Sequence, residues 1–101
     1  MNLEELNKDE TIKATVRHLA DKFGNTSFNI KDHWEGDRCA IGLIDADEKH
    51  LIYFSTCGPN GFYVSLENLK AHGDLPYEPV GDFDNVDLER LEKLFVQHLR
   101  L

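Results

Sequence analysis

The chain has 101 residues, 41% of them hydrophobic and 30% charged, and a formal net charge of −8 at pH 7. This length suffices for one hydrophobic core, so we expect a single domain over residues 1–101. The acidic balance disfavours nucleic acids and anionic membranes as partners, because their phosphates would be repelled, and it favours a basic protein; solubility alone also accounts for it.

The N-terminal part of the chain predicts an amphipathic helix that ends at Gly24, the position where glycine commonly terminates a helix. Asn2 and Asn7 each stand three residues before a glutamate, which is the spacing of a helix cap. The helix therefore begins near Leu3 or near Lys8. Its apolar stripe consists of Ile12, Val16, Leu19, Ala20 and Phe23.

Beyond this helix the apolar period changes to two, and the turn sequences EGD, DADEK and GPNG interrupt it. This pattern predicts a four-stranded antiparallel meander. The strands are expected at residues 27–34, 38–45, 50–57 and 62–66.

The register of these strands follows from pairing the largest apolar side chains and from a type I turn at GPNG. The expected pairs are Leu43 with Ile52, Ile41 with Phe54, Cys39 with Thr56, Thr56 with Val64, and Phe54 with Leu66. This register gives one continuous apolar face, and it places Cys39 and Cys57 on opposite faces. A disulfide between the two cysteines is therefore disfavoured.

The segment 67–83 contains two prolines and two glycines, which exclude a long helix and disfavour a central strand. We expect a short helical turn at 67–71, then a loop or brief edge strand at 77–83. A final helix follows, capped by Asp84 or Asn85, with its apolar face along Leu88, Leu91, Leu94, Phe95, His98 and Leu99. The expected fold is α+β: a two-layer sandwich in the order helix, four-stranded antiparallel meander, helix, with both helices on one sheet face.

Catalytic and metal chemistry find little support in the residue pattern. Cys57 could act as the nucleophile of a thiol enzyme with His33, His50 or His72 as its base, but no sequence motif places a histidine beside Cys57. The histidines and cysteines lack metal-ligand spacing, and no phosphate loop is present, so we expect no catalytic residue, metal or cofactor. Both cysteines are expected to stay thiols in a reducing compartment, and no segment resembles a signal peptide or a membrane span, so a cytoplasmic location is expected.

The sheet face opposite the helices carries two tyrosines, a residue type common in protein interfaces. It is predicted to bind a partner, although a merely half-polar face, or a face covered by 77–83, would show the same pattern. The candidate partner-binding residues are Tyr53, Tyr63, Leu51, Ile44, Cys57 and His33.

The segments LIYFSTCGPNGFYVSLE and LPYEPVGDFDNVDLERLEKLFVQHL together resemble small, mostly uncharacterised bacterial α/β domains, some of the toxin-immunity type. This resemblance implies a non-enzymatic domain that binds a protein. The acidic helix, sheet, helix layout is also similar to type III secretion chaperones, which dimerise and bind effector segments. We therefore expect a small acidic domain that binds either a protein partner or a second copy of itself. The alternatives are a type III-like chaperone and a small thiol enzyme or hydrolase that uses Cys57.

Overall fold

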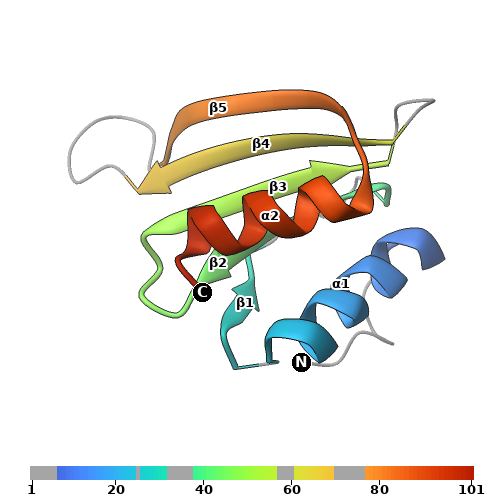
Figure 1. The fold of residues 1–101 in the computed structure, drawn as a ribbon, viewed down its shortest axis with the longest axis horizontal. Helices are drawn as coiled ribbons and strands as arrows, with labels where there is room; N and C mark the ends of the chain where they lie inside the picture. The colour runs from blue at the N-terminus through green and yellow to red at the C-terminus, as the bar shows by residue number, and fades with distance from the viewer. Residues whose placement is uncertain (1–6, 25, 32–37, 57–60, 70–76) are drawn as a thin grey trace.

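A computed structural model describes residues 7–24, 26–31, 38–56, 61–69 and 77–101. Its elements follow in the order α1 (Glu10–Phe23), β1 (Phe28–Ile30), β2 (Ala40–Asp45), β3 (His50–Ser55), β4 (Phe62–Leu69), β5 (Tyr77–Val86) and α2 (Leu88–Leu99). The strands form one antiparallel sheet in the order β1-β2-β3-β4-β5 (Figure 1). The fold is therefore α+β, as expected, but the described residues form a sheet of five strands instead of four.

Helix α1 begins after Asp9 and ends at Gly24, whose φ of 94° is readily adopted only by glycine. The backbone N–H of Asp9 donates to the carbonyl of Arg38 at 2.8 Å, which ties the start of α1 to the chain just before β2. The later of the two predicted starts, near Lys8, is close to the observed one. The earlier start, near Leu3, lies outside the described residues.

The β2–β3 register agrees with the prediction: Leu43 lies opposite Ile52 and Ile41 opposite Phe54. The β3–β4 register differs from it, because Phe54 lies opposite Val64 and Ile52 opposite Leu66. The difference is a shift of two residues, which leaves every side chain on its predicted face. The apolar pattern therefore fits both registers equally well, and the choice of turn type led to the wrong one.

Strands β4 and β5 depart most from the sequence prediction. The predicted helical turn at 67–71 is wrong for its described part, because β4 continues to Leu69. The predicted loop or brief edge strand at 77–83 is a ten-residue strand, Tyr77–Val86. Pro79 is accommodated because β5 lies at the edge of the sheet, and two irregularities interrupt its register with β4.

Helix α2 is capped by Asp87, whose carboxylate accepts a hydrogen bond from the Arg90 N–H at 2.8 Å. The predicted caps, Asp84 and Asn85, are instead part of β5, which extends to Val86. The observed cap lies later in the chain than the predicted ones because the preceding strand is longer than the sequence indicated.

One hydrophobic core joins both helices to one face of the sheet, with α2 lying over the sheet along β3 and α1 beside it towards β1 (Figure 1). The expected arrangement placed both helices over the meander, whereas α1 lies more to the side. Phe95 of α2 is central: its ring lies 5.5 Å from that of Phe23 in α1 and 5.2 Å from that of Phe28 in β1. The buried members of the core are Ile12, Val16, Leu19, Phe28, Ile41, Leu43, Ile52, Phe54, Val64, Val86, Leu91, Phe95 and Leu99.

Candidate functional site

The sheet face that points away from the helices brings together aromatic and acidic side chains from three strands. Tyr53 of β3 and Tyr63 of β4 meet edge to face, with ring centroids 6.2 Å apart. The Tyr63 hydroxyl donates to Asp82 Oδ2 of β5 at 3.4 Å, and Asp82 lies opposite Ser65 in the β4–β5 register. We call the surface formed by Tyr53, Tyr63, Ser65 and Asp82 the tyrosine face.

The strand registers explain why these side chains meet. Tyr53 lies directly opposite Ser65, and Tyr63 lies opposite Ser55, so the two tyrosines are diagonal neighbours across β3 and β4. A diagonal pair on one sheet face is within reach of aromatic rings. Both tyrosines are half-buried, so each exposes part of an amphipathic ring to solvent.

The part of the tyrosine face formed by β4 and β5 carries acidic side chains, and Lys31, which lies opposite Gly42 next to Tyr53, is on the same face towards β1. Burial raises the pKa of Tyr63, and the nearby carboxylates of Asp82 and Asp84 raise it further, so its hydroxyl stays protonated at neutral pH. Neither β4 nor β5 contains a lysine or arginine. Their acidic residues on this face are Glu67, Asp82 and Asp84, whereas Glu78 lies opposite Asn68 on the side of the helices. A cationic group of a partner would therefore be attracted to this side of the sheet.

The structure divides the six predicted partner-binding residues into three groups. Tyr53 and Tyr63 come together on the tyrosine face. Ile44 and Leu51 are buried, with exposed fractions of 1% and 0%. The expectation that they lie on an open face is therefore wrong: these aliphatic side chains are interior, and of the described members of the predicted surface only the two tyrosines reach solvent. The remaining two, His33 and Cys57, lie outside the described residues.

Sequence reasoning missed Asp82 as a member of this surface; it placed Ser65 on the correct sheet face but did not name it as a candidate partner-binding residue. Asp82 was missed because Pro79 and Gly81 predicted a loop or a brief strand there. The alternation in Asp82-Phe83-Asp84 is the signal that could have placed it, since an apolar residue between two acidic ones is typical of a strand with one buried face. Phe83 does pack against the core.

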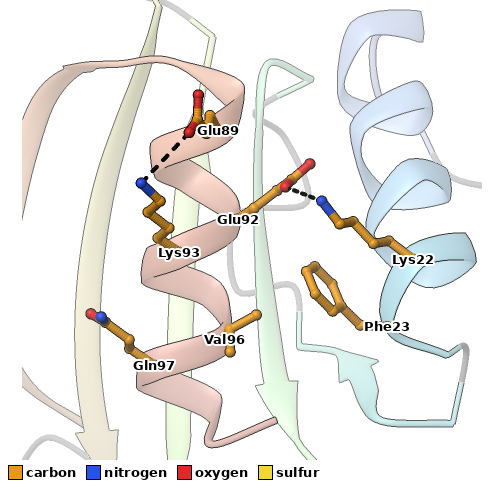
Figure 2. A pocket seen from close by; sticks show the side chains of 7 residues that line it. All are labelled: Lys22, Phe23, Glu89, Glu92, Lys93, Val96 and Gln97. Atoms are coloured by element: carbon orange, nitrogen blue, oxygen red, sulfur yellow. Dashed lines mark hydrogen bonds and ion pairs between the residues drawn. The ribbon is translucent and has the colours of Figure 1, made fainter.

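A groove of about 390 Å³ lies between α1 and α2 (Figure 2). Its lining residues are Lys22, Phe23, Glu89, Glu92, Lys93, Val96 and Gln97. Glu92 accepts from Lys22 Nζ at 2.6 Å and is also paired with His18, and both contacts hold the pKa of its carboxyl below the usual range. Lys93 pairs with Glu89 at 3.6 Å. Because these charges pair with one another across and along the helices, the groove presents no excess of either sign to a ligand.

A second cavity, of about 380 Å³, lies at the end of α2 and includes Asp45, His50 and Ser27 in its lining. His50 Nδ1 lies 2.8 Å from Asp45 Oδ2, which is the arrangement of a catalytic dyad. The Ser27 hydroxyl, however, donates to the Gly24 carbonyl at 2.7 Å. The serine proton is therefore directed to the end of α1, and the arrangement provides no serine nucleophile activated by His50.

Asp45 instead serves the β2–β3 turn. Its Oδ1 accepts from the backbone N–H of Lys49 at 2.7 Å and of His50 at 3.2 Å. Burial raises the pKa of Asp45, but the hydrogen bonds from His50 and from these N–H groups outweigh it, so the net pKa lies below the ordinary value. The carboxylate is thus a structural anion that closes the turn.

The expectation that Cys39 is a free thiol is wrong, because Cys39 is disulfide-bonded. Cys57, the only other cysteine of the chain, lies outside the described residues. Cys39 precedes the first residue of β2, so the strict alternation of faces that argued against a disulfide does not apply to it.

Within the described ranges, no group of three or more histidine, cysteine, aspartate or glutamate side chains is arranged to hold a metal ion. Neither α1 nor α2 has the length and apolar character that a bilayer-spanning helix requires. Comparisons of the chain with protein-family models, with curated proteins and with solved structures found no match.

Proposed function

We propose that this protein is a non-enzymatic binding domain that uses the tyrosine face to hold a basic protein. The observation that carries the proposal is the contact of Tyr53, Tyr63 and Asp82 on one sheet face. Tyrosines held by neighbours lose little conformational entropy when a partner covers them, and they supply apolar area together with a hydroxyl. The small-immunity-protein class, whose members neutralise toxins by binding them, is the class we favour.

The sign of the charge argues for a different protein as the partner and against a second copy of this chain. In a symmetric dimer through this face, the same surface would meet itself. Where β4 and β5 meet their own counterparts, their acidic residues would approach one another without a lysine or arginine from either strand; Lys31, on the same face, lies next to β1. Like charges brought together in this way oppose association.

The test compares the wild-type chain with a Tyr53→Ser/Tyr63→Ser double variant and with Gln97→Ser as a control. Gln97 is exposed on α2, away from the tyrosine face. Circular dichroism first establishes that all three proteins fold. Proteins from the source cell that bind the wild type and the control, but not the double variant, are then identified, and the affinity for each is measured by calorimetry.

We expect the double variant to bind its partner at least tenfold more weakly, since buried interface tyrosines commonly contribute more than about 1 kcal/mol each. The captured protein should be basic, and its affinity should fall as salt is added. Equal affinity of the folded double variant and the control would refute the proposed surface. Sedimentation velocity provides a second check. If the wild type forms a dimer and the double variant does not, the tyrosine face binds a second copy of this chain and not a basic protein.

A further inference from the structure

The free side of β5 is the longest exposed edge of the described sheet. β5 has ten residues and pairs with β4 on one side only, whereas β1, at the other edge, has three residues. Among the described residues no strand pairs with the other side of β5. A sheet edge presents backbone N–H and C=O groups that can hydrogen-bond to an additional strand.

Two features of β5 weaken its pairing with any added strand, and its charges oppose pairing with another copy of itself. Pro79 has no N–H to donate, and the register with β4 shifts between Pro79 and Gly81 and again between Phe83 and Val86. The side chains of Glu78, Asp82 and Asp84 are exposed and acidic. Two β5 strands placed side by side would bring these carboxylates close together, and like charges facing each other across strands are destabilising.

The same charges select a partner of the opposite sign. Phe83 packs against the core, so its neighbours Asp82 and Asp84 project from the other face of the strand, the one that holds the tyrosine face. A strand added beside β5 would place residues two positions apart opposite these two carboxylates. Lysine or arginine at both positions would offset the charge, whereas acidic residues would be repelled.

We propose that β5 accepts an extended basic segment of the partner protein as a sixth strand of the sheet. Two lysines or arginines separated by one residue lie opposite Asp82 and Asp84. Val80, which is 52% exposed, offers an apolar contact at the same edge. This proposal rests on the proposed function and specifies it: backbone hydrogen bonds hold the segment, and the carboxylates determine which segments are accepted.

The experiment uses the whole chain and synthetic seven-residue peptides of the sequence Thr-Val-Lys-Val-Lys-Val-Thr. One control peptide has glutamate at both lysine positions, and another carries N-methyl groups on backbone nitrogens of both of its edges. Binding is followed by NMR titration of the backbone amides. We expect the lysine peptide to shift amide signals of β5 and to bind at least tenfold more tightly than either control.

An Asp82→Asn/Asp84→Asn variant of the protein should lose most of its preference for the lysine peptide over the glutamate peptide. If the peptide that is N-methylated on both edges binds as tightly as the unmodified lysine peptide, the segment docks through its side chains and strand addition is refuted. Absence of binding by the lysine peptide, or equal binding of both charge forms, also overturns the inference. None of these results affects the proposed function, which is decided by the effect of the tyrosine variants on the native partner.

Discussion

Replacement of Asp45 by alanine tests whether a buried carboxylate organises the β2–β3 hairpin. The Asp45 side chain is 11% exposed and accepts two backbone N–H groups of its own turn and the ring nitrogen of His50. The turn also contains Glu48 at a φ of 57°, a conformation that costs energy for a residue other than glycine. The carboxylate holds that turn closed, so its removal should loosen the hairpin as well as break its hydrogen bonds.

The size of the effect follows from these contacts. A hydrogen bond to a charged group contributes about 1.5–3 kcal/mol, and a buried N–H left without an acceptor costs about 1–3 kcal/mol. The turn is near the surface, so water replaces part of what is lost. We therefore expect the free energy of unfolding of Asp45→Ala to fall by about 2–4 kcal/mol at pH 7, a decrease in Tm of about 8–32 °C for a domain of this size.

The dependence on pH separates a charge effect from simple loss of packing. The pKa of Asp45 is lower in the folded protein than its ordinary value of 3.8. Its ionised form therefore stabilises the fold above that value, and this stabilisation disappears as the pH falls through the folded-state pKa. Urea unfolding at pH 7 and near pH 3 should show a large difference between wild type and Asp45→Ala at pH 7 and a smaller one in acid. An equal difference at both pH values would refute the charge argument, and no difference at pH 7 would refute the structural role.

Two further predictions concern the tyrosine face and the end of the β3–β4 connection. The Tyr63 hydroxyl, whose signal in a pH titration is assigned by comparison with Tyr63→Phe, should have a pKa above the ordinary tyrosine value of 10.0, and Asp82→Asn should lower this pKa. An unshifted pKa in the wild type would contradict the burial of Tyr63 and its contact with the carboxylate. Gly61 has a φ of 126°, and a Cβ there would lie 2.7 Å from a backbone carbonyl oxygen of β5. Gly61→Ala should therefore destabilise the protein by more than the roughly 1–3 kcal/mol typical of a strained backbone conformation. Gly24→Ala is the control, because Gly24 also has a positive φ but its Cβ would meet nothing within 4 Å; equal losses in urea unfolding would show that the close approach of β5 is unimportant.

The elements with a strong apolar period were predictable from the sequence. The stripe of α1 and its end at Gly24 are as expected, because a 3.6-residue period and a terminal glycine are local signals. The pairing of Leu43 with Ile52 was also predictable, since matching large apolar groups allowed one register for a short turn. Strand β5 was not: Pro79 and Gly81 are poor strand residues, and only the pairing with β4 overcomes their local preference.

Burial on the second sheet face was the other failure. The alternation of side chains correctly separated Ile44 and Leu51 from the residues that face the helices. It could not show whether that second face meets water, because alternation assigns a residue to a side of the sheet and says nothing of what covers the side. Four of the six predicted contact residues are therefore either interior or outside the described ranges, and the two tyrosines remain.

The two-residue error in the β3–β4 register shows why the surface was harder to predict than the core. A shift by two exchanges one core pair for another of similar size, so Phe54 opposite Val64 and Phe54 opposite Leu66 both give an apolar face. On the other face, the predicted register would have placed Tyr63 opposite Cys57, whereas the observed one places it opposite Ser55 and next to Tyr53. The register of β5 then adds Asp82. A surface assembled from three strands depends on two registers at once, and an apolar pattern that tolerates even shifts determines neither of them.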